Sequence, residues 1–474
     1  MKSTVIFILL YSFPLLLLSQ TPSNHKNILQ KDFQLLRTTL EQKYPSLYRY
    51  ADKKTLTSLF DSCYNSIQKT TTTNIEFYRL IKLYLSTIKD GHLSSGLSPD
   101  LKEYIHNQAK FFPIRLYFTN NHAFILKSDN PTLPAGAEII AIDKRPIGQI
   151  QKNLFGFIVS DGSIETKKYH ILNNVFHFYY LLAYGEHSRF EITYQSKSGK
   201  QQSITLEAVF EKDIPQLPIQ AEPQKLLSLS IDTNQIALIT IKTFSRLELE
   251  EANENFEDFL RSSFEQINQR QIKKLIIDLR DNGGGRDLYG SLLYSYLTSK
   301  KIPYYKQLET STDSLPFEKF ARSFTSFNGL THEMLEKVTT KRFRLKKEAH
   351  TNLSHVSPNP NKYTGQVVFL INGQSFSTTA EFCAIAKSHN RGKFIGEETG
   401  GGVDGNTSGV LTELLLPNTQ IPIIFGLVQY DLATTPKLKG RGTLPDYTIH
   451  PTVQDILLGN DVQLSFAKAL LLKK

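Results

Sequence analysis

A serine-containing turn offers the first candidate for covalent chemistry. Residues 370–382 read Leu-Ile-Asn-Gly-Gln-Ser-Phe-Ser-Thr-Thr-Ala-Glu-Phe, which predicts a buried strand, a turn and the start of a helix. The hydroxyl of Ser377 would be exposed there, near the positive end of the helix dipole, where an alkoxide or oxyanion is favoured. Thr378 and Glu381 also stand at capping-box spacing, so these side chains have an alternative role as helix caps. Spacing alone favours the cap.

A glycine-rich turn follows an earlier apolar strand. Residues 275–285 read Leu-Ile-Ile-Asp-Leu-Arg-Asp-Asn-Gly-Gly-Gly, and a helical segment comes next. Glycines allow backbone N–H groups to approach a ligand closely, because no side chain blocks the way. Such a turn can stabilise an oxyanion or hold a phosphate, although the pattern is neither a Walker motif nor Gly-x-Gly-x-x-Gly. An ordinary tight turn is the third interpretation.

A histidine, His92, lies in the polar turn 88–96, just after a helical segment that ends near Ile88. An imidazole can take a proton from a serine and return it near neutral pH. Taken alone, a histidine in a polar turn is usually a surface residue. A catalytic arrangement therefore requires the fold to bring three distant segments together.

Together and in this order, the three motifs resemble the C-terminal processing (tail-specific) and tricorn-type serine peptidases. This family also has an interphotoreceptor retinoid-binding-like branch without peptidase activity. The resemblance extends over about residues 30–470 and is strongest at 275–285 and 368–402. It implies an α/β, crotonase-like catalytic domain in which Ser377 is the nucleophile. The oxyanion hole would consist of the amide of Gly283 or Gly284 and that of Thr378. No metal or organic cofactor is implied.

The resemblance also indicates the base. One branch pairs the serine with a lysine in the following glycine-rich loop, but residues 399–405 contain no lysine. The tricorn-like branch uses a histidine in a motif that resembles residues 90–93, Asp-Gly-His-Leu, which implies His92 as the general base.

Two positions depart from that branch. It usually has a serine immediately before the histidine, where this chain has Gly91, and a glutamate near the segment 442–446, where this chain has Lys439. The group that orients His92 is therefore unidentified. The weak candidates are Glu397, Glu398 and Glu413.

Length and patterning predict the elements that must position these residues. A chain of 474 residues is too long for one ordinary core. Lys2 and the apolar run 5–18 predict a signal peptide over residues 1–20, because this run is shorter than the ~20 residues of a spanning helix. The mature protein is then exported, to a periplasm or the extracellular space, without stable membrane insertion.

Three further domains are expected. Residues 27–110 have helical spacing, whereas residues 111–212 alternate like strands and contain, at 133–147, a PDZ-like segment or a plain strand-turn-strand. A linker at 213–227 precedes an α/β domain over 228–470, in which 303–363 forms an insertion over the site. Within that domain we expect strands at 236–241, 275–279, 367–371 and 393–396, and helices at 248–267, 288–297 and 379–388.

Composition limits the function classes. The net charge of +10 is scattered along the chain, which argues against nucleic-acid binding, and Cys63 and Cys383 match no metal or disulfide pattern. The leading hypothesis is an endopeptidase that cleaves unfolded or C-terminal segments of a peptide or protein substrate through a Ser-His acyl-enzyme. The alternatives are a catalytically weak or inactive scaffold of the same fold that binds peptide or an apolar ligand, and a different acyl hydrolase.

Overall fold

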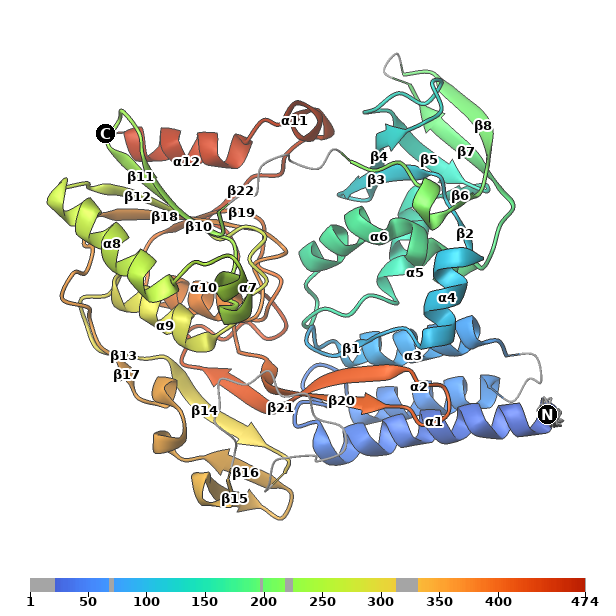
Figure 1. Ribbon diagram of the computed structural model, residues 1–474, viewed down its shortest axis with the longest axis horizontal. Coiled ribbons are helices and arrows are strands. Elements are labelled where there is room, and N and C mark those ends of the chain that lie inside the picture. The colour runs from blue at the N-terminus through green and yellow to red at the C-terminus, as the bar shows by residue number, and fades with distance from the viewer. Residues whose placement is uncertain (1–21, 68–71, 197–198, 218–224, 313–330, 474) are drawn as a thin grey trace, which may run out of the picture.

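The computed structural model describes residues 22–67, 72–196, 199–217, 225–312 and 331–473 (Figure 1). The expected signal peptide lies outside these residues, as do residues 218–224 of the expected linker and 313–330 of the expected insertion. None of the helices in these described ranges is long and apolar enough to cross a membrane.

Three helices form the N-terminal part of the chain: α1 (Pro22–Lys43), α2 (Lys53–Ser66) and α3 (Asn74–Ile88). Phe33 of α1 stacks on Phe60 of α2, with ring centroids 4.9 Å apart, and both rings meet Tyr84 of α3. After α3, Lys89 adopts a left-handed conformation with a φ of 63°, which ends the helix and turns the following residues away from its axis. His92 is in this turn.

A mixed unit follows, on the right in Figure 1. Its sheet has the order β3-β4-β5-β7-β8, with β6 paired to β5. The strands are β3 (Ile114–Thr119), β4 (His122–Ser128), β5 (Glu138–Ile142), β6 (Arg145–Pro146), β7 (Arg189–Gln195) and β8 (Gln201–Glu207). The short elements before and after it are β1 (Ser94–Ser95), α4 (Pro99–Asn107), β2 (Lys110–Phe111) and β9 (Val209–Phe210).

Two helices in this unit, α5 (Ile147–Phe155) and α6 (Thr166–Tyr184), were not expected from the alternating texture. Leu172, Phe176 and Tyr180 of α6 are buried at a spacing of four residues, as on one face of a helix. This helical pattern is present in the sequence, but the neighbouring strands obscured it. The N-terminal end of α6 lies close to the candidate site.

The α/β part contains the sheet β10-β11-β12-β18-β19-β22, in which β10 and β11 are antiparallel and the other neighbours are parallel. Its strands are β10 (Leu227–Ile231), β11 (Ile236–Ile241), β12 (Lys274–Asp278), β18 (Gln366–Ile371), β19 (Lys393–Gly396) and β22 (Tyr447–Thr448). Leu275 and Ile277 belong to one core cluster and Ile276 to another, because successive strand residues point to opposite faces. Both faces of the sheet are therefore buried.

The helices of this part are α7 (Arg246–Glu251), α8 (Phe256–Gln269), α9 (Asp287–Ser295), α10 (Thr378–Ser388), α11 (Val453–Leu458) and α12 (Val462–Leu472). Of these, α8 and α12 contact the sheet directly, α9 packs on α8 and α10, and α11 contacts β4 of the mixed unit. Ala467 and Leu471 of α12 pack in the cluster with Ile276. The single helix expected at 248–267 is wrong, since α7 and α8 are separate. Asn253 has a φ of 55°, and the Asn255 side chain accepts from the N–H of Asp258 and so caps α8.

A second sheet joins the N-terminal helices to the α/β part. The long hairpin of β20 (Thr407–Leu415) and β21 (Pro422–Leu432) runs alongside α1 and α2 in Figure 1. On β21, Ile424 is opposite Ser94 and the Phe425 ring meets that of Tyr44 at 6.0 Å. The described part of the expected insertion extends this sheet with β14 (Tyr305–Thr310), β15 (Leu335–Thr339) and β16 (Arg342–Leu345), and pairs β13 (Ile302–Pro303) with β17 (His355–Val356).

Candidate active site

Ser377 lies at the turn between β18 and α10. Its φ of 52° and ψ of −128° are unusual for a residue other than glycine, and such strain occurs in serine turns that expose a nucleophile. The Ser377 side chain makes no capping hydrogen bond to α10. The hydroxyl is therefore not committed to the helix that follows it.

The capping-box interpretation of this turn is wrong. Thr378 Oγ1 donates to the carbonyl oxygen of Gly285 at 2.9 Å. The Glu381 carboxylate accepts from Tyr305 Oη and Asn406 Nδ2, both at 2.6 Å. These partners lie far away in the sequence, so the spacing of Thr378 and Glu381 carried no information about them.

The glycine-rich turn after β12 packs directly against the serine turn. Gly284 has a φ of 99°, and a Cβ there would stand 2.6 Å from Ser377 Cβ, so only glycine fits. The N–H of Gly284 donates to Asn282 Oδ1 at 2.9 Å. Gly283, by contrast, lines the cavity in front of Ser377. Of the two candidate oxyanion donors, the Gly284 amide is thus already hydrogen-bonded to Asn282.

His92 approaches Ser377 from the turn after α3. Its Nε2 lies 3.0 Å from Ser377 Oγ, although the two residues are 285 positions apart. The imidazole also packs on the Phe376 ring, with a centroid distance of 4.4 Å. The fold thus brings the two predicted catalytic side chains into hydrogen-bonding contact.

Burial lowers the pKa of His92 to about 4; the nearby Lys167 ammonium also lowers it, against the opposing effect of Asp90. At neutral pH the imidazole is therefore uncharged. An uncharged ring with its proton on Nδ1 presents a lone pair on Nε2, which is the state needed to accept a proton from Ser377.

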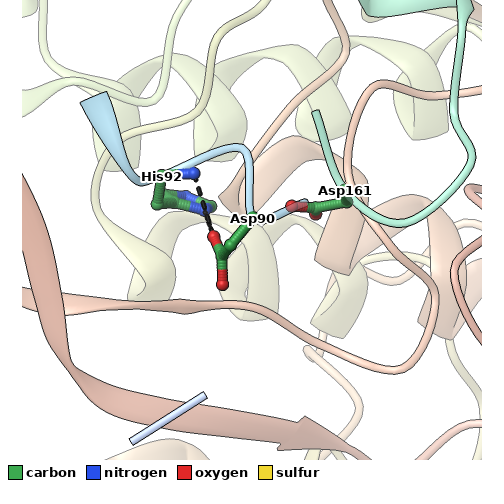
Figure 2. Close-up of side chains that lie close together, drawn as sticks. All are labelled: Asp90, His92 and Asp161. Atoms are coloured by element: carbon green, nitrogen blue, oxygen red, sulfur yellow. Dashed lines mark hydrogen bonds and ion pairs between the residues drawn. The ribbon is translucent and has the colours of Figure 1, made fainter. Parts of the chain in front are cut away.

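Asp90 and Asp161 lie close to His92 (Figure 2). Their carboxylate oxygens and a His92 ring nitrogen are all within 4.8 Å of one another, close enough to surround a metal ion. However, both oxygens of Asp161 already accept backbone N–H groups, from Gly91 at 2.6 Å and Gly402 at 2.9 Å. Lys167 adds positive charge beside both carboxylates. This donor set does not suit a cation, and we assign no metal to it.

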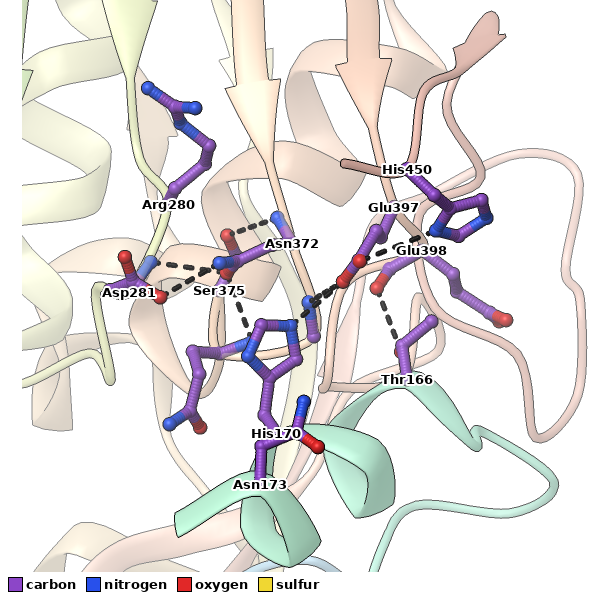
Figure 3. A network of polar contacts seen from close by, with 12 residues as sticks. Thr166, His170, Asn173, Arg280, Asp281, Asn372, Ser375, Glu397, Glu398 and His450 are labelled. Carbon is purple, nitrogen blue, oxygen red and sulfur yellow. Dashed lines mark hydrogen bonds and ion pairs between the residues drawn. The ribbon is translucent and has the colours of Figure 1, made fainter. Parts of the chain in front are cut away.

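The three glutamates considered as partners for His92 make other contacts. Glu397 accepts from His170 Nε2 at 2.8 Å, in the network of Figure 3. Glu398 pairs with Arg441 at 2.8 Å. Glu413 on β20 lines a separate hollow beside α1. Asp161, just before α6, and Lys167, within α6, belong to no motif and could not be recognised from the sequence.

A cavity of about 580 Å³ opens in front of Ser377. Asp287 and Glu381 line it. From the sequence, Glu381 was considered only as part of a capping box, and Asp287 was not considered. Burial raises the pKa of Glu381 to about 7, helped by the charge of Asp287. Glu381 is one helical turn after Ser377, a spacing of four that could have indicated a shared helix face.

The family model of peptidase family S41 matches residues 235–427, which contain Ser377 and the glycine-rich turn. The search of curated proteins found no match. The crystal structure of mature CPAF is 14% identical, with a TM-score of 0.63, and the match covers 94% of this chain and 96% of that one. The complex of mature CPAF with lactacystin is also 14% identical, with a TM-score of 0.60 and coverages of 94% and 98%.

At this identity the likeness to solved structures shows the fold. The family model matches the residues that carry the serine turn and the glycine-rich turn. Residues 235–427 therefore belong to peptidase family S41, and the chain is a serine-type peptidase.

Proposed function

We propose that this peptidase works through a Ser-His acyl-enzyme mechanism with Ser377 as nucleophile and His92 as general base. The 3.0 Å contact between His92 Nε2 and Ser377 Oγ is the observation that carries the proposal. Ser377 Oγ attacks the carbonyl carbon of the scissile peptide while its proton passes to His92 Nε2. His92 then protonates the leaving amine, and the acyl-enzyme remains.

Water completes the cycle. His92 takes a proton from the water that attacks the acyl carbonyl, and returns it to Ser377 as the ester bond breaks. For the oxyanion we favour the amide of Gly283 over that of Gly284, because the Gly284 N–H is bonded to Asn282. The second donor in this proposal is the amide of Thr378, at the N-terminus of α10.

The proposed substrates are extended peptides, in unfolded proteins or at C-termini. The mixed unit of residues 111–212 would act as a PDZ-like domain that receives such a peptide by strand addition. The catalytic unit would have the crotonase-like variant of the α/β fold, and the signal peptide would direct the enzyme to a periplasm or the extracellular space.

Fluorophosphonate labelling tests the mechanism. The mature wild-type protein should gain one adduct by intact mass at Ser377, and Ser377→Ala should gain none. Because His92 supplies the base, His92→Gln should react slower by on the order of 10³-fold. Ser408→Ala is a matched control, since Ser408 lines the same cavity but bonds to Asn406. It should label like the wild type.

Two outcomes would change the proposal. Folded wild-type protein that does not label would favour a scaffold without turnover. Labelling accompanied by hydrolysis of esters but not of a peptide library would favour a different acyl hydrolase.

A further inference from the structure

We infer that Asp90 is the positioning residue of His92, and that Lys167 and Asp161 hold the loop that carries both. This group takes the place of the glutamate that the sequence lacks near Gly442. The inference rests on the proposed roles of Ser377 and His92.

Asp90 faces the ring nitrogen that points away from Ser377. Its Oδ1 lies 3.8 Å from His92 Nδ1, and the two side chains are 2% and 8% exposed. The same oxygen accepts from the backbone N–H of His92 at 3.0 Å, which fixes the carboxylate relative to the ring (Figure 2). An Asp90 anion in this place favours the tautomer with the proton on Nδ1.

The separation of 3.8 Å is longer than a direct hydrogen bond. His92 Nδ1 and Asp90 Oδ2 are buried and have no hydrogen-bond partner among the described residues. In such surroundings the attraction between a carboxylate and an imidazolium is much stronger than in water. Catalytic hydrogen bonds are often long before substrate binds and shorten in the complex. Asp90 is thus placed to stabilise His92 when it gains the proton of Ser377.

Asp161 and Lys167 form hydrogen bonds with the peptide groups on both sides of Gly91. Asp161 Oδ1 accepts from the N–H of Gly91 at 2.6 Å, and Lys167 Nζ donates to its carbonyl oxygen at 3.2 Å. Lys167 Nζ also lies 3.1 Å from the centroid of the Phe376 ring, which in turn packs on His92. The loop is therefore tied to the residue that precedes the nucleophile.

The absence of a side chain at Gly91 leaves room for the Lys167 ammonium and the Phe376 ring. A Cβ at position 91 would stand 2.9 Å from Phe376 Cε2 and 3.0 Å from Lys167 Nζ. The serine usual in the similar branch would collide with both groups. The glycine that replaces the usual serine at position 91 is therefore required by the positions of Lys167 and Phe376.

The two charged neighbours act on His92 in opposite directions. Asp90, on the same loop, raises the pKa of His92, and Lys167, on α6, lowers it. Other charged or titratable groups packed around this cluster are Asp161, ahead of α6, and Tyr44, Arg49 and Tyr50, after α1. Removing Asp90 and removing Lys167 should therefore have opposite effects on the protonation of His92.

The effect of each substitution on the protonation of His92 can be measured from the rate of fluorophosphonate labelling of the whole chain as a function of pH. Asp90→Asn should label slower than wild type by on the order of 10²-fold and shift the acid limb of the profile to lower pH. Lys167→Met should shift the same limb to higher pH, and Lys167→Arg should restore it. Glu413→Gln is the matched control and should leave both rate and profile unchanged. Shifts of opposite sign are not expected from structural damage.

The inference is overturned if both substitutions leave the acid limb in place or move it in the same direction. NMR titration of His92 in the Ser377→Ala protein gives a readout without catalysis. There, the pKa of His92 should fall with Asp90→Asn and rise with Lys167→Met. Wild-type protein that never labels would reject the proposed mechanism, whereas normal labelling with no change in this titration would reject only the role of Asp90.

Discussion

Two histidines of this protein lie beside carboxylates, yet their pKa values shift in opposite directions. His92 Nδ1 is 3.8 Å from Asp90, and the pKa of His92 is lowered, first by burial, to about 4. His170 Nε2 is 2.8 Å from Glu397. Burial opposes its charge, but the hydrogen bond and charge of Glu397 outweigh burial and raise the pKa of His170. A carboxylate holds a proton on histidine only when the contact is direct enough to exceed the cost of burial.

The consequence is a division of roles. His92 Nε2 faces Ser377 Oγ, whereas His170 pairs with Glu397 and so joins α6 to the end of β19. Glu397 also contacts His450 at 3.4 Å and accepts from the N–H of Gly373 at 3.3 Å (Figure 3). The second pair therefore anchors the mixed unit to the α/β part, close to the turn that carries Ser377.

Removing the charge of Glu397 should reduce stability without affecting the reactivity of Ser377, and this is the largest effect that we expect. We expect Glu397→Gln to lower the free energy of unfolding by about 2 kcal/mol, because charge-assisted hydrogen bonds in a largely buried site are lost. Urea unfolding measures this. Glu250→Gln removes an exposed ion pair with Arg246 and should leave the midpoint unchanged. Loss of labelling without loss of stability would mean that Glu397 acts on His92 instead.

A smaller expected effect is that the stabilisation by the His170–Glu397 pair depends on pH. The raised pKa of His170 gives stabilisation that is complete below the unfolded pKa of 6.5 and is lost as pH rises through the folded value. In Glu397 burial alone would raise the pKa, but hydrogen bonds from His170 and His450 lower it overall. Its stabilisation is present above the unfolded pKa of 4.5 and is lost as pH falls through the folded value.

The contribution of this pair should thus be greatest between about pH 4.5 and pH 6.5. The difference in unfolding free energy between wild type and Glu397→Gln should decrease from that window toward pH 9, because the raised pKa of His170 stops contributing there. Urea titrations across this range provide the measurement. A difference that grows above pH 7 would contradict the raised pKa of His170.

The contrast also explains what the sequence could predict. The strands of the parallel sheet were predictable because apolar runs at 236–241, 275–279 and 367–371 are buried on both faces. The proximity of Ser377 and His92 was expected only through the resemblance of three motifs. Their spacing of 285 residues contains no geometric information of its own.

The surroundings of His92 could not be predicted in this way. Asp161 and Lys167 come from a segment whose helix was mistaken for part of a strand-rich region, and neither stands in a recognisable pattern. Glu397, Glu398 and Glu413 were only weak candidates for the partner of His92. Which carboxylate faces which histidine depends on side-chain directions that only the fold determines.

The smallest expected effect comes from Gly91→Ala, which tests how closely the His92 loop fits. The added methyl would meet the Phe376 ring at 2.9 Å and Lys167 Nζ at 3.0 Å. Since Lys167 is flexible at its end, we expect it to move away and the loss of unfolding free energy to stay near 1 kcal/mol. Displacing the ammonium weakens its effect on His92, so the acid limb of labelling should shift slightly to higher pH, in the direction of Lys167→Met. An unchanged profile with the same loss of stability would mean that Lys167 contributes packing alone, and that the low pKa of His92 is due to burial.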